Sequence, residues 1–202
     1  MKGVIFNVVE EVLAETLPTG AWDAALVSTG LDGAYTSLGD YPDAEMRAIL
    51  AAVSARSGME EGTILRHAGR YGYRLLAERH ADLVAPFATF GDLVRHLDDV
   101  IHPEVLKLYP HAHPPQFEFP DAGADAGASG PDEERWVLVY RSDRGLCDLA
   151  IGLLQGAAAS FGLHAEVAQT ACVHRGDGEC RLEVSVDGAG SGAVHGAEGT
   201  PR

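Results

Sequence analysis

The sequence predicts an α+β protein, in which a helical amino-terminal half is followed by an antiparallel β-sheet half with one inserted helix. Two observations predict this class. Up to about residue 108, apolar residues recur at steps of three and four, the spacing of amphipathic helices. From about residue 116, apolar and polar residues alternate in short segments, as they do in strands, and a helical period interrupts them once.

Glycine and proline divide the helical half into separate helices. The first is expected over residues 3–16, where valines recur on one face, and a short helix at 22–27 precedes a turn-rich segment. Pro42 stands at a favoured first-turn position, and Gly58 ends the helix that begins there. The longer helices of this half are expected over residues 43–56 and 63–80, and a third, which carries His102, is expected to start at a weak capping box of Thr89 and Asp92 and to include Leu93 to Leu108.

The last of these helices carries His102 directly before Pro103. Proline has no N–H to donate, and it disfavours helical geometry at the residue before it. We therefore expect a kink or a helix restart at His102. A side chain beside such a break can move without the unwinding of a whole helix.

The second half is expected to form a sheet with one helix at 146–161. The residues Arg175-Gly176-Asp177-Gly178 suit a hairpin turn between its last two strands. An Ala-, Gly- and Asp-rich stretch at 121–134 reads as a mobile loop, and the Gly-rich tail at 187–202 as disordered, which leaves one domain over residues 1–186. The strands are expected over residues 117–119, 136–140, 164–173 and 180–186.

Composition narrows the class of function. The chain has 202 residues and a hydrophobic fraction of 46%, enough for a sizeable core. Fifteen basic and thirty acidic residues give a net charge of −15, which repels nucleic acid and anionic lipid. No apolar run is long enough to span a bilayer, and the first residues do not resemble a signal peptide, so a soluble cytoplasmic protein is expected. Three cysteines, an odd number, favour metal or redox chemistry over a disulfide framework.

His102 is the first candidate ligand. It lies beside the apolar face of its helix, and Asp98 and Asp99 lie within one helical turn of it. A neutral imidazole in an apolar, sheltered place is a good ligand for iron or zinc. The alternative is a half-buried histidine with one hydrogen bond.

A second group of polar residues follows the strand at 136–140. Tyr140, Ser142 and Arg144 form a Tyr-x-Ser-x-Arg sequence, and alternate residues of an extended strand share a face. Two hydroxyls and a guanidinium suit a pair of carboxylates, which arginine can bind bidentately. The alternative is an edge strand with polar residues in water.

Three features together resemble the H-NOX family, the haem nitric oxide/oxygen binding (HNOB) domains of bacterial gas sensors and of the soluble guanylate cyclase haem subunit. They are the opening Met1-Lys2-Gly3, His102 followed by Pro114-Pro115, and the Tyr-x-Ser-x-Arg sequence. The resemblance covers about residues 1–186. It implies haem b between the two halves, with His102 as the proximal iron ligand and Pro115 pressing on the porphyrin. It also implies that Tyr140, Ser142 and Arg144 bind the haem propionates.

The resemblance also bears on which gas is bound. Family members that hold O2 stably carry a distal tyrosine five residues beyond the motif's arginine, where this chain has Leu149. Ile5 and Leu153 are expected to add further apolar lining, although Tyr71 or Tyr73 could bring a hydroxyl to the pocket. The resemblance therefore implies a sensor that binds NO and CO at ferrous iron and excludes O2.

Signalling in such a sensor involves a second protein. The resemblance implies that NO weakens the Fe–His102 bond and that the His102 helix then shifts against the strand half. The sequence contains no kinase, cyclase or phosphodiesterase segment, so the output is expected on a separate partner, a histidine kinase or a cyclic-di-GMP enzyme.

The cysteines suggest a second metal site. Some H-NOX members bind zinc through three cysteines spaced like Cys147, Cys172 and Cys180, with a histidine three residues before the second cysteine. That position is Gln169 here, a poor zinc ligand, so His174 or His164 would have to complete a Cys3His set. The alternatives are three partly buried free thiols, or a thiol redox sensor in which oxidation displaces the metal.

Other classes of function remain open at this stage. A haem-free module of related shape could bind a different apolar molecule. A haem enzyme such as a peroxidase is disfavoured, because no distal histidine with an arginine partner is apparent, and no catalytic residue is expected. His113, just before Pro114-Pro115, is the second choice of axial ligand.

Overall fold

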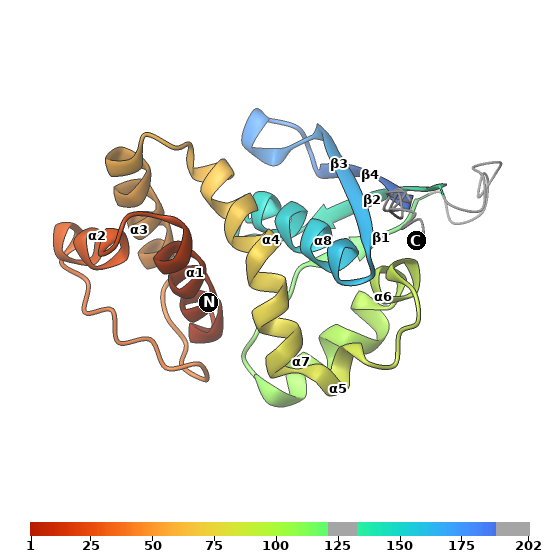
Figure 1. The fold of residues 1–202 in the computed structure, drawn as a ribbon, viewed down its shortest axis with the longest axis horizontal. Coiled ribbons are helices and arrows are strands. Elements are labelled where there is room, and N and C mark those ends of the chain that lie inside the picture. The colour runs from red at the N-terminus through yellow and green to blue at the C-terminus, as the bar shows by residue number, and fades with distance from the viewer. Residues whose placement is uncertain (121–132, 189–202) are drawn as a thin grey trace, which may run out of the picture.

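A computed structural model describes residues 1–120 and 133–188 of the chain (Figure 1). It confirms the predicted α+β class, with helices first and a four-stranded antiparallel sheet after them. The helices are α1 (Gly3–Thr16), α2 (Ala21–Thr29), α3 (Asp43–Ser57), α4 (Glu61–Arg79), α5 (Ala81–Val84), α6 (Phe90–Arg95), the π-helical turn η1 (Leu97–Ile101), α7 (His102–Leu108), α8 (Cys147–Ser160) and the 3-10 turn η2 (Val173–Arg175). The strands are β1 (Gln116–Glu118), β2 (Glu133–Arg141), β3 (Leu163–Ala171) and β4 (Cys180–Gly188).

The helices α1 to α4 enclose one hydrophobic core. The apolar face of α1 contributes Phe6, Val9 and Leu13, which are fully or almost fully buried. They pack with the inner faces of α3 and α4, represented by Ile49 and Ile64. Figure 1 shows α1, α2 and α3 grouped on one side of the long helix α4.

A second core lies between α8 and the sheet. The strand order is β1-β2-β4-β3, and every neighbouring pair is antiparallel. Leu138 and Leu182 are opposite each other in β2 and β4, and both are completely buried beside Ile151 of α8. This arrangement places α8 between the sheet and the helical half, as Figure 1 shows.

Glycines allow the two halves to join closely where α4 and α8 cross. A Cβ atom at Gly152 would lie 2.1 Å from the backbone oxygen of Arg66, and one at Gly156 would lie 2.3 Å from that of Arg70. No side chain fits at such distances, because the atom it would meet belongs to the backbone. The contact between α4 and α8 therefore depends on backbone surfaces and fixes the relative position of the two halves.

The helix that carries His102 begins after the predicted cap Thr89, whose hydroxyl accepts a hydrogen bond from the Asp92 N–H at 3.1 Å, and it is divided into α6, η1 and α7. The α-helical hydrogen-bond pattern begins again as α7 at His102, but the backbone stays helical at Ile101 and His102, with φ angles of −69° and −63°. The expected loss of helical geometry at His102 is therefore not observed, and the change is from a π-helical to an α-helical turn. Pro103 lies in the first turn of α7, where its missing N–H is not needed. The turn η1 before the break is wider than an α-helix, and the N–H of His102 bonds to the carbonyl of Leu97, five residues back.

Several element ends differ from the sequence-based expectations. The strand predicted to reach residue 173 ends at Ala171, and the 3-10 turn η2 begins at Val173, before the left-handed Gly176. Strand β2 begins at Glu133, inside the predicted loop at 121–134, and β4 continues to Gly188, two residues past the predicted domain end. The rest of that loop and the tail at 189–202 lie outside the described residues. The short helix α5 was not predicted.

None of the helices in the two described ranges is long and apolar enough to cross a membrane.

Candidate functional site

A cavity of about 320 Å³ lies between the helical half and the sheet half. Its wall is almost entirely apolar and includes side chains of α1, α4, α6, η1, α7 and α8. The predicted site residues in this wall are Ile5, His102, Pro115, Tyr140, Ser142, Arg144, Leu149 and Leu153. Ile5 and Leu153, which are 148 positions apart in the sequence, thus share one wall. The volume of the cavity falls in the range of small-molecule and cofactor sites.

His102 enters the cavity wall from the first position of α7. Its side chain is only 16% exposed, and its Nδ1 lies 2.9 Å from a carboxylate oxygen of Asp98. Burial lowers the pKa of His102 below the ordinary histidine value and outweighs the opposing effect of Asp98. The imidazole is therefore neutral at pH 7. Because a carboxylate only accepts hydrogen bonds, the proton is on Nδ1, and Nε2 carries the lone pair that a metal needs.

The Tyr140, Ser142 and Arg144 side chains all reach the cavity, but not from one strand as the sequence predicted. Strand β2 ends at Arg141, and Ser142 and Arg144 lie in a turn that closes at Gly145, whose φ is +66°. Serine, aspartate and glycine favour such a turn. The Ser142 hydroxyl accepts a hydrogen bond from the Arg144 backbone N–H at 3.3 Å, which keeps these residues together.

Arg144 already binds oxygen acceptors from two other segments. Its Nε donates to Asp43 at 3.2 Å, and its Nη1 donates to the carbonyl of His113 at 2.6 Å. Tyr140 beside it is 4% exposed, and burial raises its pKa to about 12. The cavity thus has a polar corner with a carboxylate-binding guanidinium and a neutral phenol hydroxyl.

Sequence reasoning missed Asp43. It lies on α3, 101 residues before Arg144, and no local pattern marks it as a partner. The hydroxyl of Tyr109, which lies 3.3 Å from Nε2 of His80 at another part of the wall, was missed for the same reason.

The structure distinguishes between the two candidate tyrosines and between the two candidate histidines. Tyr73 of α4 lines the cavity and burial raises its pKa, whereas Tyr71 is 51% exposed and does not line it. His113 also borders the cavity, but it is exposed on the irregular segment before Pro114. His102, which is sheltered and held by a carboxylate, is the better placed of the two histidines.

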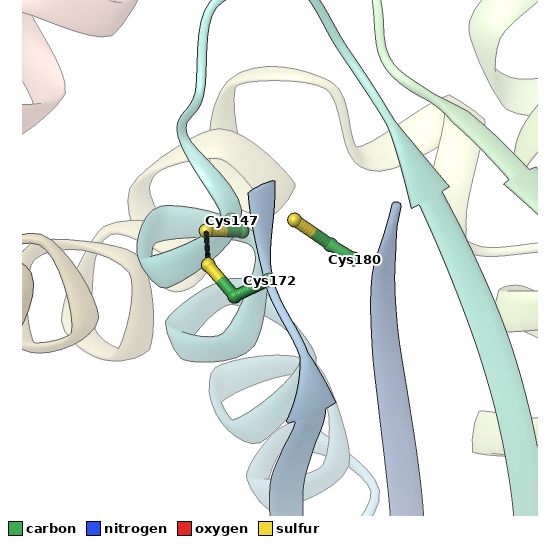
Figure 2. A group of neighbouring side chains, drawn as sticks. All are labelled: Cys147, Cys172 and Cys180. Atoms are coloured by element: carbon green, nitrogen blue, oxygen red, sulfur yellow. Dashed lines mark hydrogen bonds between the residues drawn. The ribbon is translucent and has the colours of Figure 1, made fainter. Parts of the chain in front are cut away.

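The three cysteines come together at the end of the sheet nearest the start of α8 (Figure 2). All three are buried, their sulfur atoms lie within 4.8 Å of one another, and the Cys147 and Cys172 sulfurs are 3.8 Å apart. Burial raises the pKa of Cys147 to about 12, and it raises the pKa of Cys180 as well. The thiols of Cys147 and Cys180 are therefore protonated at neutral pH unless a metal ion replaces their protons.

No fourth ligand completes this cluster among the histidines and carboxylates of the described ranges. His174 is exposed, and its Nε2 lies 2.7 Å from the carbonyl oxygen of Gly145. His164 pairs with Asp187 at the opposite end of the β3–β4 ladder. The structure thus brings neither histidine to the cysteines, while the buried amide nitrogen of Gln169 has no hydrogen-bond partner.

The fold and the cavity define a class of protein that holds a cofactor between a helical half and a sheet. A neutral imidazole and a carboxylate-binding corner project into one largely apolar space. An apolar group that carries carboxylates and a metal ion matches these features.

Comparisons with known proteins identify the family. The profile of the family described as Haem-NO-binding matches residues 2–169, so the chain belongs to that family. No curated protein was found to match the chain. An H-NOX protein from S. oneidensis in the Fe(II)NO state is 31% identical, with a TM-score of 0.80, and the match covers 93% of this chain and 99% of that one.

Two further solved structures extend this comparison. The Shewanella oneidensis H-NOX domain in the Fe(II)CO state is 32% identical, with a TM-score of 0.76 and coverage of 91% and 97%. The unliganded Fe(II) H-NOX protein from K. algicida is 21% identical, has a TM-score of 0.76 and covers 93% and 96%, which establishes a shared fold.

Proposed function

We propose that this chain is a haem-based gas sensor that binds NO and CO, excludes O2 and signals to a separate protein. The observation that carries the proposal is the cavity wall, in which His102 and the Tyr140, Ser142 and Arg144 group surround an apolar space. Membership of the Haem-NO-binding family and the Fe(II)NO and Fe(II)CO states of the S. oneidensis relatives support it.

The residues present fit haem b. His102 would supply a neutral nitrogen to the iron, and Arg144, Tyr140 and Ser142 would bind the two propionates. Arg144 already binds the carboxylate of Asp43, which supports this role. Pro115 lines the same cavity and would contact the porphyrin. The haem would supply a ferrous iron that binds diatomic gases.

We propose that three apolar residues of the cavity wall account for the exclusion of O2. Ile5, Leu149 and Leu153 offer no hydrogen-bond donor, and bound O2 depends on one far more than NO or CO does. Tyr73 of α4, which also lines the cavity, carries a hydroxyl that could act as a donor.

The proposed signal begins at His102. His102 would hold the iron from the first position of α7, so a weaker bond there would let α7 shift at the π-helical turn before it and change the surface presented to a partner. We propose a histidine kinase or a cyclic-di-GMP enzyme as that partner. One haem domain is proposed, which the last strand extends to Gly188. The cytoplasmic location stays a prediction from the sequence.

Absorption spectra test this function. The protein reconstituted with haem should show a Soret band, and the reduced protein should change its spectrum with NO and CO but not with air. His102→Ala should lose or strongly shift the band, whereas His113→Ala should behave as wild type. A wild-type protein without a Soret band, or an unaltered spectrum in His102→Ala, would refute the proposal and favour a haem-free binding module.

We propose a sensor and not a haem enzyme. Peroxide cleavage needs a histidine with an arginine partner beside the bound peroxide. Arg144, the arginine that lines the cavity in the described residues, instead binds Asp43 and the carbonyl of His113 in the polar corner. Peroxide turnover well above that of free haem would contradict this assignment and indicate a peroxidase.

We also propose a structural zinc ion on Cys147, Cys172 and Cys180. Tetrahedral zinc with Zn–S bonds of about 2.3 Å separates its sulfur ligands by about 3.8 Å, and the Cys147 and Cys172 sulfurs lie at that separation. The fourth position would need Gln169, a water molecule or a rearranged His174. Without metal, the same cluster would serve as a thiol redox sensor.

Metal analysis separates these alternatives. Wild type and Cys172→Ser should differ by about one zinc per chain. His174→Ala should lose the metal only if that ring rotates away from Gly145, so retention of zinc in this variant excludes it as a ligand. Equal metal content in wild type and Cys172→Ser would leave three thiols and no zinc site.

A further inference from the structure

The carboxylate of Asp98 bridges two parts of the molecule. One oxygen lies 2.9 Å from Nδ1 of His102, and the other accepts a hydrogen bond from the backbone N–H of Phe117 at 2.6 Å. Asp98 belongs to η1, His102 begins α7, and Phe117 is the middle residue of β1. A single side chain thus joins the cavity histidine to the sheet.

The bridge fixes the orientation of the imidazole. Asp98 holds Nδ1, and the ring of Phe117 lies 6.0 Å from the His102 ring, centroid to centroid, at an interplanar angle of 29°. A histidine held by a carboxylate at one nitrogen is a stronger and better oriented metal ligand at the other. Asp98 is 35% exposed, so water competes for its carboxylate. The hydrogen bond to His102 therefore depends on η1 to hold Asp98 in place.

We propose that Asp98 is a positioning residue that strengthens coordination by His102 and couples that coordination to strand β1. This inference rests on the proposed haem function. The inference adds two points to that function. Asp98 binds the histidine nitrogen that would not hold the metal, and it gives the histidine a connection to the sheet.

The route continues beyond β1. Phe117 is opposite Tyr140 in the β1–β2 pair, and their rings are 5.6 Å apart. Tyr140 belongs to the polar corner with Ser142 and Arg144. A rotation of His102 that pulls on Asp98 therefore acts on the strand beside the proposed propionate site. The side chain of the neighbouring Asp99 is exposed and makes no hydrogen bond or ion pair within the part of the chain that the structure describes, which makes Asp99 a matched control.

The test compares Asp98→Asn with Asp99→Asn in the haem-loaded protein. The two donors bind different oxygens of Asp98, and in asparagine one of these becomes an NH2 group that donates, so it cannot accept both hydrogen bonds in this arrangement. We expect Asp98→Asn to move the iron–histidine stretching band in the resonance Raman spectrum to lower frequency. We also expect it to transfer haem to apomyoglobin about tenfold faster, the lower end of the usual effect of removing such a partner. Asp99→Asn should match wild type in both measurements.

Amide hydrogen exchange separates the coordinating role from a purely structural one. Exchange at Phe117 should rise in Asp98→Asn and stay unchanged in Asp99→Asn. If only this exchange changes while the Raman band and the haem transfer rate do not, Asp98 is a structural tie and the inference is wrong. An unchanged Phe117 amide overturns the coupling to β1. If wild type binds no haem, the proposed function itself fails; if wild type binds haem and the two variants are alike, only this inference fails.

Discussion

Leu149 is the residue from which the gas selectivity was predicted, and the structure places it in the cavity wall. It is 7% exposed and lines the cavity from the first turn of α8. The side chain has no hydrogen to donate, so a polarised ligand would gain nothing from it. This single position therefore offers a direct test of the proposed exclusion of O2.

Leu149→Tyr should increase the affinity of the ferrous protein for O2 by about tenfold or more. A hydrogen bond to a charged or strongly polarised acceptor contributes about 1.5–3 kcal/mol, and 1.4 kcal/mol corresponds to a factor of ten. The measurement is an O2 titration of the reduced protein followed at the Soret band. Leu149→Phe adds a ring without the hydroxyl, so it should remain insensitive to air. An equal O2 response in both variants would show that ring size, not hydrogen bonding, controls selectivity.

At the scale of the elements, the ends of helices were easier to predict than the contacts between them. Helix α1 has the predicted bounds because its valine period and its neighbouring breakers are local signals. The restart at His102 was predictable for the same reason, since Pro103 is adjacent. The pairing of Arg144 with Asp43 and the bond from Asp98 to Phe117 were not, because they depend on how separate elements pack.

In the site, too, local features were easier to predict than the path of the backbone and the contacts between elements. Tyr140, Ser142 and Arg144 were predicted to share a strand face, but the chain turns after Arg141 and still delivers all three to the cavity. The residue types suggested carboxylate-binding chemistry, which stays a prediction, whereas the backbone path depended on Gly145 at a φ of +66°. The fourth ligand of the cysteine cluster could not be predicted, since spacing along the chain does not show which side chain faces the sulfurs.

The crossing of α4 and α8 should be intolerant of any added side chain. At Gly152, a Cβ atom would lie 2.1 Å from the Arg66 backbone oxygen, so Gly152→Ala has to push the two helices apart. We expect a loss of about 2 kcal/mol in the free energy of unfolding, because overpacking costs about 1–3 kcal/mol and exceeds the gain in helix propensity. Urea denaturation measures this loss.

Gly178→Ala is the matched control for that substitution. A Cβ atom there has no neighbour within 4 Å, and its φ is not positive. Its stability should stay within about 0.5 kcal/mol of wild type. If Gly152→Ala were as stable as Gly178→Ala, the close backbone contact between α4 and α8 would not be what holds the halves in place.

At the scale of the whole molecule, the cavity separates two hydrophobic cores. One core is formed by α1 to α4 and the other by α8 with the sheet, and both contribute to the cavity wall. A ligand in this space would contact both cores at once, and binding to the folded state alone stabilises it. The folding of the halves and the occupancy of the site are therefore linked.

Buried groups beside this junction make the molecule sensitive to alkaline pH. Burial raises the pKa of Tyr140 from 10 to about 12 and also raises the pKa of Cys147. Because these groups hold their protons longer in the folded state than in the unfolded state, their contribution is complete below their unfolded pKa values. It is lost as the pH rises toward the folded values, between about pH 9 and 12. For Tyr140 alone, the free energy of unfolding should fall by about 1.4 kcal/mol between pH 8 and pH 11.

Tyr140→Phe removes the ionisable hydroxyl and should remove that part of the pH dependence. Urea midpoints measured at pH 8, 10 and 11, at matched haem content, should fall less steeply in this variant than in wild type, whatever its stability at pH 8. Tyr71→Phe changes a tyrosine that is 51% exposed and should follow the wild-type curve. Parallel curves for wild type and Tyr140→Phe would mean that the phenol of Tyr140 ionises as easily in the folded protein as in the unfolded chain. In that case the polar corner of the cavity would be open to water, and the sheltered environment on which the proposed propionate site depends would not exist.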